Sequence, residues 1–157
     1  MKRMFIRTDR CTGCRLCELI CAIMKTMSCD LNRASVKIHS DKPEHYVPRV
    51  CLQCGTALCI DACTIKFAMS RDEKTGAVIV DHAKCDGCGK CVITCSFSAI
   101  RQVSDAEVSI CDLCSGDPAC VKYCPTGAIL YMEPEEMRKK ITNEALIRFE
   151  KCIAATM

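Results

Sequence analysis

Sixteen of the eighteen cysteines in this 157-residue chain fall into four groups of four, called quartets below. In each quartet two residues separate the first two cysteines, and three residues separate the last two. The quartets are Cys11, Cys14, Cys17 and Cys21, then Cys51, Cys54, Cys59 and Cys63, then Cys85, Cys88, Cys91 and Cys95, then Cys111, Cys114, Cys120 and Cys124. Cys29 and Cys152 lie outside them. Thiols in such numbers form disulfides, bind zinc or bind iron–sulfur clusters.

The spacing within the quartets favours iron–sulfur clusters. Disulfide frameworks belong to oxidising compartments, and residues 1–6 contain no apolar stretch that could begin a secretory signal. Zinc sites usually combine two separated C-x2-C pairs, whereas a triplet such as Cys11, Cys14 and Cys17 would crowd three ligands onto one loop. Such a loop suits one face of a cubane, and in two-cluster ferredoxins the fourth cysteine ligates the other cluster. The sequence therefore predicts four clusters in two cross-linked pairs, with each fourth cysteine at the start of a short helix.

The composition agrees with an interior filled by clusters. Aromatic residues make up 4% of the chain and tryptophan is absent, so something other than aromatic rings must fill the core. The formal charge of +3 counts every cysteine as neutral, and sixteen thiolates with four 2+ cluster cores would change it to about −5. The basic balance is therefore no sign of nucleic-acid binding. No run approaches the roughly 20 apolar residues that cross a bilayer, so we expect a soluble cytoplasmic protein.

The quartets indicate internal repeats of a ferredoxin unit, in which a loop is followed by a short helix and a strand. Short apolar segments follow the last three quartets at residues 64–69, 96–100 and 125–130. Between the second and third quartets, Thr75 and Gly76 predict a turn and residues 77–80 a strand, which together indicate a hairpin.

The segment from Glu133 onward predicts a helix. Pro134 suits a first helical turn, and the acidic residues around it favour the positive end of the helix dipole. One amphipathic face follows, formed by Met137, Ile141, Ala145, Phe149 and Ile153. Two interpretations of this face are open: it packs on its own domain, or it docks a partner subunit.

Residues outside the quartets indicate no catalysis. The sequence shows no nucleophile held by a base, no phosphate-binding glycine loop and no acid pair placed for proton transfer. We expect Cys29 and Cys152 to be buried small hydrophobic residues. The three histidines, His39, His45 and His82, are expected at the surface. Four cations in or beside the cysteine loops, Arg15, Lys84, Lys90 and Lys122, either balance charge or raise cluster potentials by stabilising the reduced state.

Four stretches of the chain resemble one known family. They are TGAVIVD at residues 75–81, CDGCGKC at 85–91, CDLC at 111–114 and ACVKYCPTGAI at 119–129. Together they resemble the four-cluster ferredoxin-like subunits of the dimethyl-sulfoxide-reductase beta-subunit type. That family includes the small electron-transfer partners of formate dehydrogenases, carbon-monoxide dehydrogenase and tungsten aldehyde oxidoreductases. The resemblance extends from about residue 7 to residue 132.

The resemblance implies which cysteines share a cluster, because in that family the first quartet pairs with the fourth and the second with the third. Site 1 would be Cys11, Cys14, Cys17 and Cys124; site 2, Cys21, Cys111, Cys114 and Cys120; site 3, Cys51, Cys54, Cys59 and Cys95; and site 4, Cys63, Cys85, Cys88 and Cys91. Some relatives lack one third-quartet cysteine and carry a [3Fe–4S] centre. Because Cys88 is present here, the resemblance implies four [4Fe–4S] clusters, with iron bound through these sixteen cysteines.

The chain departs from the family pattern at two positions that touch cluster surroundings. Thr64 and Ser96 stand where the family has a proline after the last cysteine of the second and third quartets. That proline stops a helix and shields the cluster. We expect its replacement to change solvent exposure and potential without removing a ligand. The inner loop at residues 55–58 is also less acidic than is typical of the family.

The implied fold is α+β, with two interlocked ferredoxin-like dicluster modules related by pseudo-twofold symmetry. The four-cluster domain would span residues 1–132, and the amphipathic helix residues 133–157. Module A would comprise about residues 1–47 and 104–132. Module B, about residues 48–103, would be inserted between its halves.

The implied function is that of a non-catalytic subunit that relays single electrons to or from a catalytic oxidoreductase in anaerobic metabolism. The resemblance points first to a large tungsten or molybdenum partner of the tungsten aldehyde-oxidoreductase type. Ferredoxin partners of carbon-monoxide dehydrogenase, formate dehydrogenase or hydrogenase are alternatives. An iron–sulfur redox sensor is an alternative of another class. A flavin- or ferredoxin-type redox partner and self-association also fit, whereas contacts with nucleic acid or membrane are not expected.

Overall fold

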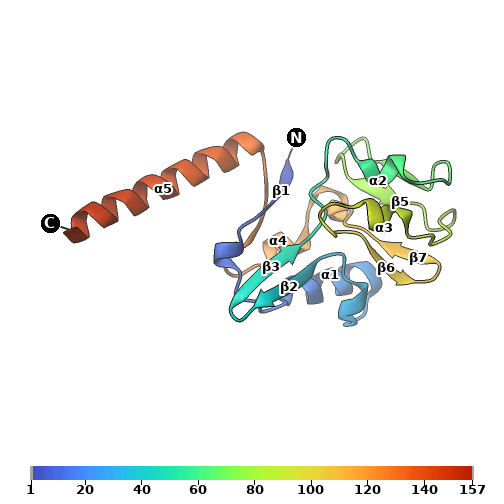
Figure 1. The fold of residues 1–157 in the computed structure, drawn as a ribbon, viewed down its shortest axis with the longest axis horizontal. Coiled ribbons are helices and arrows are strands. Elements are labelled where there is room, and N and C mark those ends of the chain that lie inside the picture. The colour runs from blue at the N-terminus through green and yellow to red at the C-terminus, as the bar shows by residue number, and fades with distance from the viewer. Residues whose placement is uncertain (1, 157) are drawn as a thin grey trace.

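The computed structural model describes residues 2–156, with side chains described for residues 2–147 apart from Leu146. Helices and short strands are mixed along this range (Figure 1). The helices are α1 (Leu16–Thr26), α2 (Leu58–Asp61), α3 (Lys90–Thr94), α4 (Ala119–Lys122) and α5 (Pro134–Thr156), with short 3-10 segments at Thr8–Arg10, Leu31–Arg33 and Leu113–Gly116. The mixed helix-and-strand class predicted from the sequence is confirmed.

The strands pair two by two into separate antiparallel sheets. The pairs are β1 (Arg3–Ile6) with β8 (Ile129–Met132), β2 (Lys37–Lys42) with β3 (His45–Arg49), β4 (Met69–Arg71) with β5 (Val78–Val80), and β6 (Arg101–Ser104) with β7 (Glu107–Ser109). The β4–β5 pair confirms the hairpin predicted at Thr75 and Gly76, where Asp72 Oδ2 accepts from Thr75 N at 2.8 Å and Gly76 has a φ of +72°. Because a two-stranded sheet is marginal on its own, each pair depends on what it packs against.

Segments far apart in the sequence lie side by side. In the β1–β8 pair, Met4 lies opposite Tyr131, so the start of the chain joins the segment after the fourth quartet. Helix α1 packs against α4, and α2 packs against α3. Figure 1 shows α2 and α3 at one end of the molecule, with α1 and α4 nearer the middle. The first quartet thus lies with the fourth and the second with the third, while the boundary of module B at residues 48–103 stays a prediction.

The four quartets share one helix register. Each of α1 to α4 begins one residue before the third cysteine of its quartet, at Leu16, Leu58, Lys90 and Ala119. The expectation that a helix starts at the fourth cysteine is therefore wrong. Helices α2, α3 and α4 end before the fourth cysteine, and Cys95 is extended with φ −73° and ψ 103°. The chain leaves the helix at this point and directs the fourth thiol toward a different site.

The buried core is small and contains cysteines as well as aliphatic residues. Its largest fully buried apolar side chains are Leu113, Ile129, Val36, Val78 and Val108. Six quartet cysteines belong to the same cluster of buried residues, namely Cys17, Cys21, Cys51, Cys91, Cys111 and Cys120. The thiols therefore occupy positions where a globular protein of this size would normally place large apolar side chains.

Helix α5 begins at Pro134, one residue after the predicted start at Glu133, and extends away from the rest of the chain (Figure 1). Its first turns are held to the body, because Met137 is buried and Glu144 pairs with both Arg7 and Arg10. Ile141, on the predicted amphipathic face, is 51% exposed. The side chains of Phe149 and Ile153 lie outside the described residues. Within the described part of the chain, no helix is both long and apolar enough to cross a membrane.

Candidate metal centres

The structure brings the cysteines of sites 1, 3 and 4 together around three separate cavities. The first cavity is lined by Cys11, Cys14, Cys17 and Cys124, the second by Cys51, Cys54, Cys59 and Cys95, and the third by Cys63, Cys85, Cys88 and Cys91. In each set three thiols come from one quartet and the fourth comes from the paired quartet. This grouping is the one that the family resemblance implies.

The cysteines of site 2 also lie together, and they are the most deeply buried set. Cys21, Cys111 and Cys120 are buried and Cys114 is partly buried. Burial strongly raises the pKa of Cys120, and the nearby thiolates of Cys111, Cys21 and Cys114 raise it further. All sixteen quartet cysteines are thus accounted for in four groups of four.

Burial gives these thiols unusual acid–base properties. It raises the pKa of Cys17 and Cys111 to about 12, and that of Cys51 and Cys91 to about 11. A buried thiolate therefore needs a compensating cation, which iron supplies when it displaces the thiol proton. Cys124 is the exception: burial raises its pKa, but hydrogen bonds from backbone and from Thr126 outweigh burial and lower it.

Three of the fourth cysteines accept a hydrogen bond from a backbone N–H. Ala128 N lies 3.2 Å from Cys124 Sγ, Ala99 N lies 3.4 Å from Cys95 Sγ, and Ser35 N lies 3.3 Å from Cys21 Sγ. The first two donors lie four residues after their cysteine. Hydrogen bonds to cluster sulfurs are one of the determinants of reduction potential.

Glycines allow the cysteine loops to pass close to neighbouring segments. Gly87, between the first two cysteines of the third quartet, has a φ of +71°, and a Cβ there would lie 2.3 Å from Asp105 O. Gly13 has a φ of +72°, and its Cβ would lie 2.7 Å from the Tyr46 ring. Larger residues would push the loops away from the β6–β7 turn and from β3.

The donor sets suit a cluster of several atoms. At sites 1, 3 and 4 the four thiols surround a cavity rather than converging on one point. In the described part of the chain, no three His, Cys, Asp or Glu side chains are arranged to hold a single metal ion. Four thiols around a common volume are the ligand set of a [4Fe–4S] cubane, which bonds one thiolate to each iron.

Ser96 lines the largest of these three cavities. The cavity at site 3, which Ser96 lines, has a volume of about 180 Å³. The cavity at site 1, where Pro125 lines the wall, has a volume of about 20 Å³, and so does the one at site 4. The replacement of proline is therefore accompanied by a larger cavity at Ser96, whereas the cavity at site 4 is as small as that at site 1 although Thr64 follows Cys63.

Three polar residues near the sites were not predicted from the sequence. Gln53 is buried; its Nε2 donates to Cys111 O at 2.6 Å and its Oε1 accepts from Val78 N at 2.8 Å, so it joins the second quartet to the fourth. Glu18 and Lys25 are the other two, on α1. A usable signal existed for Glu18, because the other three quartets have isoleucine or valine directly after the third cysteine.

The predictions for residues outside the quartets have mixed outcomes. Lys84 and Lys122 pair with Asp81 and Asp117, which favours charge balance over tuning of potentials. Cys29 is exposed, so the expectation that it is a buried hydrophobic residue is wrong. The side chain of Cys152 lies outside the described residues.

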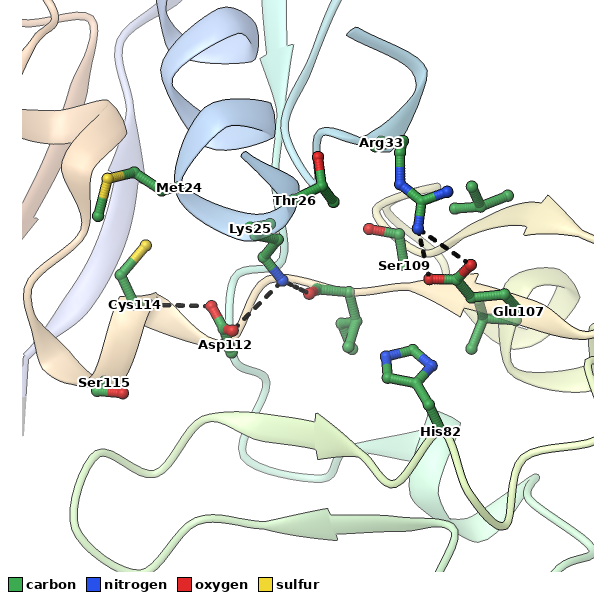
Figure 2. A pocket seen from close by; sticks show the side chains of 13 residues that line it. Met24, Lys25, Thr26, Arg33, His82, Glu107, Ser109, Asp112, Cys114 and Ser115 are labelled. Atoms are coloured by element: carbon green, nitrogen blue, oxygen red, sulfur yellow. Dashed lines mark hydrogen bonds and ion pairs between the residues drawn. The ribbon is translucent and has the colours of Figure 1, made fainter. Parts of the chain in front are cut away.

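A cavity of about 530 Å³ lies beside site 2, between the end of α1 and the β6–β7 hairpin. Figure 2 shows the side chains that line it. Lys25 reaches across it, with Nζ 2.8 Å from Ile110 O and 3.4 Å from Asp112 Oδ2. Asp112 Oδ1 in turn accepts from Cys114 N at 3.0 Å. Lys25 thus links α1 to the loop of the fourth quartet.

Comparison with known proteins also indicates that the chain binds [4Fe–4S] clusters. The chain matches a family described as "4Fe-4S dicluster domain" over residues 43–134, and one described as "4Fe-4S binding domain" over residues 8–25. It is 39% identical over 122 residues to the aliphatic sulfonate oxidoreductase, polyferredoxin-like subunit, of Pyrococcus furiosus, covering 77% of this chain and 70% of that protein. It is 30% identical over 172 residues to electron transport protein HydN of Escherichia coli, covering 88% and 93%.

A similar solved structure is a chain of the active site complex BamBC of benzoyl coenzyme A reductase, in complex with 1,5 dienoyl-CoA. The likeness has a TM-score of 0.50 and 28% identity, and covers 94% of this chain and 90% of that chain. The predicted [4Fe–4S] cofactors and the non-catalytic, electron-transferring role are confirmed by these comparisons. The dicluster match alone covers more than half of the sequence, and the chain therefore belongs to the 4Fe-4S dicluster domain family.

Proposed function

We propose that the chain relays single electrons along a row of four [4Fe–4S] clusters in the order site 1, site 2, site 3, site 4, with the ligand sets given above. The observation that carries this order is the proximity of thiols from successive sites. Besides burial, the pKa of Cys120 (site 2) is raised by the thiolate of Cys17 (site 1), and that of Cys111 (site 2) by Cys51 (site 3). Cys59 (site 3) likewise raises the pKa of Cys91 (site 4).

The two interlocked modules belong to the same proposal. The β1–β8 pair and the α1–α4 contact support module A, and the α2–α3 contact supports module B. The pseudo-twofold relation between the modules is proposed on the repeated quartets. Within this arrangement the clusters carry out the redox chemistry, and the protein sets their spacing and potentials.

The proposed partner is a large catalytic oxidoreductase subunit, because a relay has no substrate of its own. Similar proteins are named as subunits of oxidoreductases, including aliphatic sulfonate oxidoreductase and NADH-dependent phenylglyoxylate dehydrogenase. The resemblance to the dimethyl-sulfoxide-reductase beta-subunit type favours a tungsten or molybdenum enzyme, with the tungsten aldehyde-oxidoreductase type first. The cytoplasm is the proposed location.

The test is anaerobic purification of the tagged chain from its native host, followed by metal analysis of the intact complex. We expect about sixteen iron per copy of this chain, with tungsten or molybdenum on a co-eluting large subunit. Iron near that value with nickel instead would keep the relay and change the partner class. Zinc in place of iron would contradict the proposal as a whole.

A further inference from the structure

Glu18 is a buried carboxylate beside site 1. It is 0% exposed. Its Oε1 accepts a hydrogen bond from Ile38 N at 2.5 Å, and its Oε2 lies 3.5 Å from Lys37 Nζ but accepts no hydrogen bond from the described residues. Ile38 and Cys17, the residue preceding Glu18, both line the site 1 cavity. The carboxyl group therefore lies beside this site, with Lys37 as its ion-pair partner.

Packing does not explain a carboxylate at this position. The residues that follow the third cysteine in the other three quartets are Ile60, Val92 and Val121. The same helix register is thus built three times with an aliphatic side chain. Burying a carboxylate has a desolvation penalty that an aliphatic residue avoids, so Glu18 is the costlier choice for stability.

The same helix presents a positive charge to site 2. Lys25 lies about two turns beyond Glu18 on α1 and contacts Ile110 O and Asp112, which flank Cys111 (Figure 2). Its side chain is 22% exposed, and Asp112 offsets part of its charge. Lys37 offsets Glu18 in the same way, but Glu18 is fully buried. Water therefore screens Lys25 more than Glu18, and the influence of Lys25 on its site is weaker.

We propose that α1 sets a step in reduction potential between sites 1 and 2, with Glu18 lowering the potential at site 1 and Lys25 raising it at site 2. This inference rests on the proposed relay. Reduction adds one electron to a cluster, so a fixed negative charge disfavours the reduced state and a positive charge favours it. One electron that leaves the reduced cluster at site 1 and reduces the oxidised cluster at site 2 then moves downhill.

The test measures four midpoint potentials on the isolated chain, by anaerobic EPR-monitored titration. Cys124→Ser and Cys114→Ser assign the signals of sites 1 and 2. In Glu18→Gln we expect the reduced-to-oxidised ratio of the site 1 cluster to rise on the order of tenfold at a given potential, which is 59 mV for a one-electron couple. Lys25→Gln should lower the ratio at site 2 by less. Glu18→Asp, which keeps the charge, should stay near the wild-type value.

Two results would overturn the inference: an unchanged site 1 potential in Glu18→Gln with full iron content, or a uniform shift of all four potentials. If Glu18→Gln loses the site 1 cluster, the Lys25→Gln variant tests the inference instead. An unchanged potential at site 2 in that variant would contradict the proposed potential difference between sites 1 and 2. These measurements need no catalytic partner. If no large subunit co-purifies from the native host, that result counts against the relay. The potential difference between sites 1 and 2 is still tested by the titrations of the isolated chain.

Discussion

In the quartets of α1, α2 and α3, the same three-residue gap separates the last two cysteines. The residues around the cluster sites nevertheless differ between α1 and the pair α2 and α3. Helix α1 has 11 residues and carries two charged groups toward its sites, whereas α2 and α3 have four and five residues with Ile60 and Val92 at the equivalent of Glu18. The cavity at site 3 is also larger, about 180 Å³ against about 20 Å³ at site 1. The spacing determines where thiols lie, and the residues between them determine charge and exposure, which tune a cluster.

Removal of the clusters should have the largest effect on both regions, α1 and the pair α2 and α3. Chelation of iron under denaturing conditions, followed by refolding without metal, should leave a chain without cooperative tertiary structure, because the core is small and the sheets are two-stranded. Hydrogen exchange should retain more protection in α1 than in α2 or α3, since short isolated helices are marginal. Native-like protection around α2 and α3 in the apoprotein would contradict this order.

Single ligand substitutions should separate the two regions. Cys124→Ser is expected to remove or convert the cluster at site 1, and Cys95→Ser that at site 3, each with a loss of up to about four iron from about sixteen. Iron analysis and EPR would measure this loss. Cys29→Ser, at an exposed cysteine outside the quartets, is the matched control and should keep full iron. A signal lost from the set of Cys111, Cys114 and Cys120 in Cys124→Ser would refute the crossed ligand assignment.

The quartet pairing was implied only by the family resemblance, because it joins distant segments of the chain. Cluster chemistry could be predicted from the sequence itself because ligand identity and spacing are local. The β4–β5 hairpin was predictable for the same reason, through Thr75 and Gly76. The β2–β3 hairpin was not, because its strand residues around His39 and His45 are polar and resemble a loop. Gln53 and Lys25 could not be found either, since each acts on a cysteine loop more than 50 residues away.

Gln53 is the contact through which the two regions depend on each other. Gln53→Leu should leave Cys111 O and Val78 N buried without this partner, at a cost of about 1–3 kcal/mol for each group. The thermal midpoint should fall, and iron should be released first from sites 2 and 3. Gln102→Leu is a milder control, because Gln102 is exposed and makes one bond, to Gly87 O at 2.8 Å. Equal losses in both variants would show that Gln53 has no special role between the regions.

The smallest expected effect is a change in the site 3 potential when its larger cavity is covered. Ser96→Pro should fit, because Cys95 already has φ −73° and ψ 103°, a conformation compatible with a following proline. Covering the cavity would exclude water and disfavour the more negative, reduced cluster, so the site 3 potential should fall by less than about 59 mV. Thr64→Pro is the counterpart at site 4, where the cavity is already about 20 Å³ and little change is expected. Film voltammetry would measure the potential shift in both variants. A larger shift in Ser96→Pro than in Thr64→Pro would show that solvent access lowers the potential. Equal shifts would show that the proline acts in another way.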